Sequence, residues 1–186
     1  MPTLAPSSVD RIYGDFKAVS ALLDPVAGFS IRSSVDDLYR KALLLAAASW
    51  FEHSVTETIT KVARGPSGLS GVIVNFLKNK AIHRQFHSYF DWDSTNAWRF
   101  FGLFGEDFRE YARAQLSHNP GVEEAISAFV EIGRDRNRMV HQDYGSYSLE
   151  KTSDEIYSLY RCALPFVEGL EVLLTGFTPS METPSP

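Results

Sequence analysis

Apolar residues recur every three or four positions along most of this 186-residue chain, which is the spacing of α-helices with one buried face. The pattern predicts a first helix over residues 9–23, which Pro25 ends. A long second helix is predicted from Ser34 to about Gly65, because Ser34 and Asp37 have capping-box-like spacing at a helix start. The N-terminal part of the chain is therefore predicted to be helical.

Shorter helices are predicted in the middle of the chain, and two longer ones follow them. The shorter helices cover residues 68–80, 81–90, part of 91–105, and 106–116. A helix from Val122 to about His141 comes next. The last helix begins with a capping box of Thr152 and Glu155, and we expect it to kink at Pro165.

These elements predict an all-α fold, a helical bundle with additional short helices in the middle. The stretch GVIVNF at residues 71–76 is the one short candidate for a strand. We expect a single domain over residues 1–176, which is long enough to bury a substantial core. Residues 177–186 show no apolar pattern that would join this core, and they are predicted to form a flexible tail.

The composition narrows the choice of function. A net charge of −5 argues against a broad basic surface for nucleic acid, although it is compatible with a local basic cleft. The single cysteine, Cys162, excludes an internal disulfide, and its apolar neighbours predict that it is buried. We find no signal peptide, and the apolar run 42–49 is too short to span a bilayer. We therefore expect a cytoplasmic protein without membrane contact.

The helix predicted over residues 122–141 carries polar side chains on the face that should be buried. Its apolar stripe consists of Val122, Ile126, Phe129, Val130, Gly133 and Val140. Asn137 falls inside this stripe, and Arg136 and His141 lie at its two edges. Buried guanidinium and amide groups need hydrogen-bond partners. The three residues therefore form either a structural network that ties the helix to a neighbour or a functional site.

An arginine and a histidine five residues apart on one helix suit chemistry at a phosphate. Arginine holds phosphate oxygens in a bidentate fork, and histidine transfers protons near neutral pH. Such a pair can cleave RNA without a metal or a cofactor. One group takes the proton of the 2′-hydroxyl, which attacks the phosphate, and another protonates the leaving 5′ oxygen. The products are a 2′,3′-cyclic phosphate and a 5′-hydroxyl.

The same arginine–histidine pattern occurs a second time, from Arg113 to His118. The residues NPG follow directly and predict the end of a helix, where a histidine is favoured by the helix dipole. The pair Arg136 and His141 is therefore the better candidate, because Asn137 follows its arginine directly and the pair flanks an apolar stripe.

The residues RNRMVH at 136–141 resemble the motif of the HEPN superfamily, near the end of a penultimate helix that a turn and a long capped helix follow. The stretch SWFEHSV at 49–55 is similar to the HEPN helix whose glutamate, here Glu52, faces this motif. The extended middle, residues 83–105, most resembles the RiboL-PSP-HEPN subgroup. The likeness covers roughly residues 33–176.

The resemblance implies a HEPN-like helical bundle that cleaves an RNA substrate as a metal-independent endoribonuclease without a cofactor. It also implies a homodimer with a composite active site, a toxin or phage-defence role, and an antitoxin or defence-system partner protein. By position, Arg136 would bind and stabilise the scissile phosphate, and His141 would transfer the proton. Asn137 would orient the motif or contact the substrate, and Glu52 would pair with Arg136.

One departure from the pattern concerns a tyrosine. HEPN toxins paired with nucleotidyltransferase antitoxins often carry a tyrosine two residues after the histidine, whereas Tyr144 stands three residues after His141. The regulatory modification of that tyrosine is therefore not carried over to this chain.

Other chemistry-bearing residues favour structural or surface roles. His83 and His87 have the spacing of metal ligands on a helix, but no third ligand is evident. A basic exposed face that could contact RNA is the better interpretation, because Lys78, Lys80 and Arg84 lie nearby in the sequence. His53 is predicted to lie at the surface. A set of aromatic residues is predicted to belong to the core or a dimer interface rather than to stack on bases: Trp92, Trp98, Phe100, Phe101 and Phe104.

Two alternatives to a ribonuclease stay open. The chain is compatible with a non-catalytic HEPN module that binds RNA, a nucleotide or a partner protein. It is also compatible with an antitoxin-like or scaffold protein in which a pair of Arg136 and Glu52 serves structure alone.

Overall fold

The computed structural model describes residues 6–23, 28–65, 69–117 and 119–178, and it confirms the all-α fold, because this part of the chain contains helices and no strand. The long helices are α1 (Ser8–Leu23), α2 (Phe29–Arg64), α7 (Pro120–His141) and α8 (Ser153–Thr175). The short elements are α3 (Gly71–Leu77), η1 (Lys78–Ile82), α4 (Phe86–Tyr89), α5 (Trp98–Gly102) and α6 (Glu106–Leu116). Of the predicted tail, residues 179–186 lie outside the described part.

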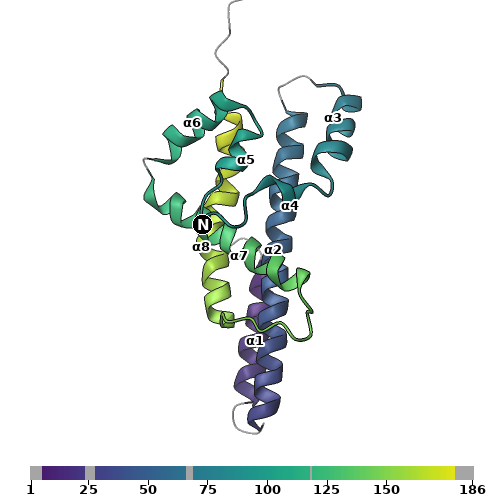
Figure 1. Ribbon diagram of the computed structural model, residues 1–186, viewed down its shortest axis with the longest axis vertical. Helices are drawn as coiled ribbons and strands as arrows, with labels where there is room; N and C mark the ends of the chain where they lie inside the picture. The colour runs from purple at the N-terminus through teal and green to yellow at the C-terminus, as the bar shows by residue number, and fades with distance from the viewer. Residues whose placement is uncertain (1–5, 24–27, 66–68, 118, 179–186) are drawn as a thin grey trace, which may run out of the picture.

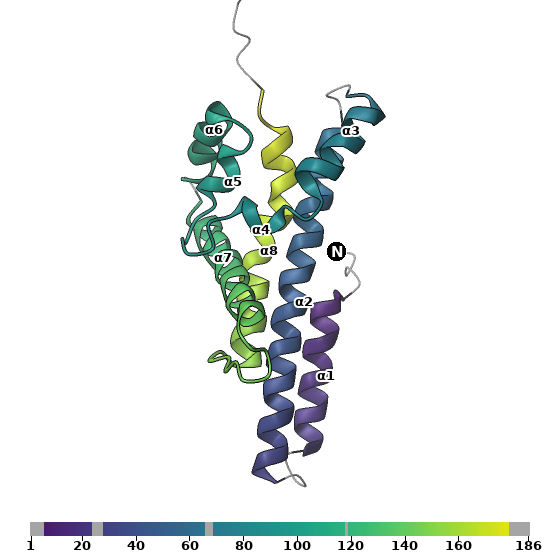
Figure 2. The same ribbon diagram turned by 45° about the vertical axis from the view of Figure 1, so that its right-hand side comes forward.

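The four long helices form the body of the molecule (Figure 1). α1 lies along the N-terminal half of α2, α8 runs beside α2, and α7 packs against both α8 and α2 (Figures 1 and 2). The short helices gather at the end of the bundle where α2 and α8 finish. None of the described helices combines the length and apolar character that crossing a bilayer requires.

Three of the predicted helices have the expected limits, and local sequence explains why. α1 ends at Leu23 as predicted, although Pro25 lies outside the described residues. α6 spans the predicted stretch 106–116. α8 begins with the predicted capping box, in which the Thr152 side chain accepts from the Glu155 backbone amide and the Glu155 side chain accepts from that of Thr152. α8 then continues through Pro165 to Thr175.

The predicted start of α2 is wrong. The helix begins at Phe29 after Gly28, so Ser34 and Asp37 lie inside it and form no capping box. The Ser34 hydroxyl instead donates to the carbonyl of Ser30, 3.0 Å away, which is the alternative that a helix offers to a serine in its interior. Asp37 pairs with Lys41, whose ammonium lies 2.8 Å from its carboxylate.

The predictions for residues 68–90 are only partly right. The strand candidate 71–76 is helical, since Ser70 caps α3 by accepting a hydrogen bond from the amide of Ile73. The helix predicted over 81–90 is wrong in its first half. α3 passes into the π-helical turn η1, the chain then breaks at Arg84 with a φ of 61°, and helical structure returns only at Phe86. π-Turns and left-handed non-glycine residues are uncommon and concentrate at functional sites.

An aromatic core joins the long helices to the short ones. Phe51 of α2, Phe129 of α7 and Tyr160 of α8 are fully buried, and Phe51 lies 5.2 Å from Phe129 and 5.6 Å from Tyr160 between ring centroids. Phe100 and Phe101 of α5 are also fully buried, which confirms the core prediction for them. Trp92 and Trp98 are partly buried against this core, and Phe104 is exposed.

The burial predicted for Cys162 is wrong, because its side chain is exposed. Tyr160 and Ala163 on the same turn of α8 face the core instead. Apolar neighbours along a helix do not place a residue inside, since only one face of the helix is covered.

Candidate functional site

The C-terminal half of α7 carries the RNRMVH motif, and its helical geometry spreads the motif over two sides of the helix. Met139 is fully buried, whereas Arg136 and Asn137 are half-buried and His141 is exposed. Val140, expected in the apolar stripe, is 42% exposed, so that part of the prediction is wrong. The buried face of α7 turns toward Ile132 and Met139, and this rotation leaves Arg136 and His141 facing an opening.

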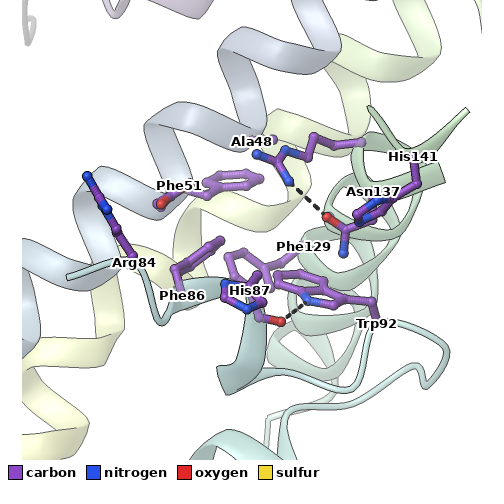
Figure 3. Close-up of a pocket in the computed structure, with 12 residues that line it drawn as sticks. Ala48, Phe51, Arg84, Phe86, His87, Trp92, Phe129, Asn137 and His141 are labelled. Carbon is purple, nitrogen blue, oxygen red and sulfur yellow. Dashed lines mark hydrogen bonds between the residues drawn. The ribbon is translucent and has the colours of Figure 1, made fainter. Parts of the chain in front are cut away.

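A cavity of about 530 Å³, here called the motif cavity, lies beneath this half of α7. Three segments that are distant in sequence line it: α2, the segment 84–92 and α7 (Figure 3). All four predicted site residues are in its wall: Glu52, Arg136, Asn137 and His141. Its floor is apolar and includes Phe51 and Phe129.

The Arg136 guanidinium makes one hydrogen bond among the described residues, from Nη1 to Oδ1 of Asn137 at 3.1 Å (Figure 3). The predicted pairing of Arg136 with Glu52 is not formed, since no ion pair in the described part of the chain joins these two side chains. Glu52 nevertheless lines the same cavity. Arg136 therefore presents N–H donors to the cavity, and its neighbour Asn137 orients it.

The charge in the motif cavity differs in sign from that of the whole chain. Two guanidinium groups, of Arg84 and Arg136, face a single carboxylate, that of Glu52, and two imidazoles add to the lining. The chain as a whole has a formal net charge of −5. The motif cavity is thus the local basic cleft that a phosphate-binding function needs in an acidic protein.

Gly133 brings a second segment against the motif helix. The backbone at Gly133 is so close to the Trp92 indole that a Cβ atom at this position would overlap the ring. The indole Nε1 donates to the backbone carbonyl of His87 at 2.8 Å. Because only glycine permits this approach, Gly133 fixes Trp92 on α7 and Trp92 fixes α4 at the edge of the motif cavity.

The sequence analysis placed Arg84 and His87 on a basic exposed face and Trp92 in the core or an interface, and it assigned none of them to this site. His83 and His87 were expected to share one exposed helix face, but the break at Arg84 separates them, and only His87 lines the motif cavity. The available signal was Gly133, a glycine in the middle of an apolar stripe. Such a position indicates close approach of another segment, although it does not say which one.

A second polar group on α7, here called the lysine cluster, consists of Glu131, Asp135 and Lys151. The Lys151 ammonium lies 2.7 Å from Asp135 and 2.8 Å from Glu131. Burial lowers the pKa of Lys151, but its hydrogen bonds to Asp135 and Glu131 outweigh this effect and raise the pKa above its ordinary value of 10.5. The lysine cluster ties α7 to the segment that leads into α8.

The remaining described candidates, such as His53 and Tyr144, do not line the motif cavity. His53 is exposed, as predicted, and His118 of the second arginine–histidine pair lies outside the described residues. Within the described part of the chain, no group of three acidic, histidine or cysteine side chains has the geometry of a metal site. Tyr144 is exposed, and its ring centroid lies 5.2 Å from the ammonium of Lys41.

A helical bundle that presents an Arg-Asn-x3-His motif and a glutamate from a second long helix to one cavity has the features of a HEPN-type domain. A family model for RiboL-PSP-HEPN matches residues 10–175, and the chain belongs to this family. No curated protein and no solved structure matches the chain significantly.

Proposed function

We propose that this protein is a metal-independent endoribonuclease that cleaves RNA to 2′,3′-cyclic phosphate and 5′-hydroxyl ends. One observation carries the proposal: Arg136, Asn137, His141 and Glu52 come from two distant helices and line one cavity that is open to solvent. The cavity volume of about 530 Å³ is in the range of sites for small ligands and suits a nucleotide segment.

The roles follow from the chemistry of each side chain. The Arg136 guanidinium binds the scissile phosphate and stabilises the charge that develops on its oxygens. Asn137, which already accepts from Arg136, orients that group. The exposed His141 transfers a proton between the cavity and the reacting oxygens. Glu52 lines the same cavity and offsets part of the positive charge of Arg84 and Arg136.

The proposal also covers the oligomeric state, the cellular location and the biological role of the protein. We place the protein in the cytoplasm, where RNA is available, as a toxin or phage-defence effector that an antitoxin or another defence protein restrains. The exposed positions of Val140 and His141 at the end of α7 are accessible to a second copy of the chain. This access supports a homodimer in which two motif cavities form one composite cleft.

The test is cleavage of a mixed RNA pool in EDTA by the wild type, by His141→Ala and by the matched control His53→Ala. His53 is exposed on α2 and does not line the motif cavity. We expect the wild type and His53→Ala to produce 2′,3′-cyclic phosphate and 5′-hydroxyl ends and His141→Ala to lose this activity. Equal cleavage by all three proteins would point to a contaminant and contradict the proposal.

A folded wild type that binds RNA without cutting it would favour the non-catalytic binding module instead. Sedimentation analysis of the same samples gives the oligomeric state, which the composite cleft requires to be a dimer.

A further inference from the structure

The motif cavity contains a second imidazole that the Arg-Asn-x3-His motif does not include. His87 of α4 and His141 of α7 line the same cavity, and the view of Figure 3 draws the His87 ring between the side chains of Phe86 and Trp92. Both histidines are exposed to solvent, so both can exchange protons with it. Cleavage through a 2′,3′-cyclic phosphate needs two proton transfers, and one histidine cannot do both in the same step.

The structure holds His87 in place through contacts that reach back to the motif helix. Gly133 lies one turn before Asn137 on α7, and it admits the Trp92 indole. The indole Nε1 donates to the His87 carbonyl at 2.8 Å, and Phe86 beside it packs 5.7 Å from Trp92 between ring centroids. His87 is therefore held to α7 although it lies about fifty residues away in the chain.

The break in the helix before α4 also helps to place His87 at the motif cavity. Arg84 adopts a φ of 61°, a left-handed conformation that is unfavourable for a residue with a Cβ atom. The turn at Arg84 separates η1 from α4, and both Arg84 and His87 then line the motif cavity. A continuous helix from residue 78 to residue 89 would lack this turn. Strain kept at the edge of a cavity is characteristic of functional sites.

We propose that His87 is the second proton-transfer residue of the cleavage reaction and that it acts with His141. One imidazole takes the proton of the 2′-hydroxyl as the bond from the 2′ oxygen to phosphorus forms. The other, protonated, gives its proton to the 5′ oxygen as the bond from phosphorus to that oxygen breaks. The reaction consumes no water, and it leaves the two histidines with exchanged protonation states. This inference rests on the proposed ribonuclease function.

The other charged groups around His87 and His141 are consistent with these roles. The remaining titratable side chains that line the motif cavity are Glu52 on α2, Arg84 before α4 and Arg136 on α7. Guanidinium groups bind phosphate oxygens, whereas imidazole is the usual general acid–base group of enzymes.

The test compares two substrates that differ in one atom. The first is an RNA oligonucleotide with a mapped cleavage site, and the second has sulfur in place of the bridging 5′ oxygen at that site. A thiolate leaves without being protonated, so this substrate does not need the general acid. The proteins compared are the wild type, His87→Ala, His141→Ala and the control His83→Ala, whose exposed histidine does not line the motif cavity.

We expect His87→Ala and His141→Ala each to cut the ordinary RNA at least about 100-fold more slowly than the wild type, and His83→Ala to cut it normally. On the sulfur substrate, one of the two deficient variants recovers and the other does not, which identifies the acid and the base. Normal cleavage of RNA by His87→Ala overturns the inference and leaves the ribonuclease function intact. An equal response of both variants to sulfur overturns it as well.

A wild type that cuts neither substrate removes the ribonuclease proposal itself, and this inference with it.

Discussion

The C-terminal half of α7 contributes polar side chains to two groups, the lysine cluster and the motif cavity. In the first group the charged side chains have partners of opposite charge, and in the second they face an open cavity. Asp135 is 6% exposed and its carboxylate is held by Lys151, which also binds Glu131. Its neighbour in sequence, Arg136, makes a hydrogen bond only to Asn137 among the described residues and otherwise faces the motif cavity. One residue of helical rotation, about 100°, separates the two environments.

The comparison shows that a charged residue on the inner side of a helix serves structure when the fold supplies a partner of opposite charge, and can serve function when it does not. In the lysine cluster, the Lys151 ammonium pairs with two carboxylates, and these interactions stabilise the folded state. In the motif cavity, donors are left for a ligand, and interactions that a substrate would use add little to stability. We therefore expect substitutions in the lysine cluster to change stability, and substitutions in the motif cavity to change activity.

The largest effect is expected for Arg136→Ala. Removal of the phosphate-binding guanidinium should lower the cleavage rate about 1,000-fold, which corresponds to about 4 kcal/mol of transition-state stabilisation. The free energy of unfolding should change by less than about 1 kcal/mol, because the side chain is half-buried and has one partner in its own helix. Cleavage rates and chemical denaturation of the same preparations give both quantities.

Arg138→Ala is the matched control for this prediction. Arg138 lies on the same helix, is exposed and does not line the motif cavity, so it should retain both activity and stability. A loss of stability in Arg136→Ala as large as that of a core substitution would assign Arg136 to structure and remove the contrast with the lysine cluster.

A smaller effect, about 3 kcal/mol of lost stability, is expected for Gly133→Ala. The added methyl group would overlap the Trp92 indole, so Trp92 or α7 must move, and overpacking of this kind is destabilising. The displaced Trp92 also releases His87, so activity should fall together with stability. Thermal unfolding and tryptophan fluorescence report the two changes.

Gly169→Ala provides the comparison for Gly133→Ala. Gly169 is in the interior of α8, and a Cβ atom there would meet nothing within 4 Å. The alanine should raise the free energy of unfolding by up to about 1 kcal/mol, because alanine has the higher helix propensity. Equal destabilisation by both substitutions would show that the approach of Trp92 is not what Gly133 permits.

Lys151→Met should cost about 2 kcal/mol of stability and leave cleavage unchanged. It leaves the carboxylate of Asp135 buried without its cation. The pKa of Lys151 is raised in the folded state, so its contribution is complete below the ordinary value of 10.5 and declines as the pH rises past its folded pKa. The difference in unfolding free energy between wild type and variant should therefore shrink above about pH 10.5.

The exposed pair of Lys61 and Glu171 is the control for Lys151→Met. Its atoms are 2.7 Å apart, but the side chains are 69% and 42% exposed. Lys61→Met should change stability by less than about 0.5 kcal/mol. If the Lys151→Met variant is fully folded but loses cleavage activity, the lysine cluster contributes to the function of the motif cavity.

The smallest effect is expected from a change in salt concentration, which should weaken RNA binding at the motif cavity but hardly affect the lysine cluster. Two phosphate contacts, by Arg84 and Arg136, predict that RNA affinity falls about sevenfold between 50 and 200 mM salt. Arg84→Gln should reduce the logarithmic slope by about 0.7. The partly buried lysine cluster is screened less, so the free energy of unfolding should hardly change over this range. Fluorescence anisotropy with the inactive His141→Ala variant measures the affinity, and salt-independent binding would contradict a phosphate-gripping cavity.

The sequence predictions are accurate where the structure depends on interactions between residues close together in the sequence, and less accurate elsewhere. The periodicity of the long helices and the capping box of Thr152 and Glu155 depend on residues within four positions of one another, and these predictions are confirmed. The start of α2 was misplaced because the spacing of Ser34 and Asp37 suits both a cap and a helix interior. The break at Arg84 had no sequence signal, since arginine rarely adopts a positive φ.

The sequence by itself determined the long helices and the place of the RNRMVH motif near the end of α7, because a helix places residues i, i+3 and i+4 together without help from the rest of the chain. Only the tertiary structure decided which polar groups of that helix are satisfied. Lys151 neutralises Asp135, whereas the motif cavity leaves Arg136 facing solvent. The tertiary structure alone also brought His87 into the cavity that His141 lines, through the contact of Trp92 with Gly133. Such contacts depend on the packing of distant segments, which no local pattern encodes.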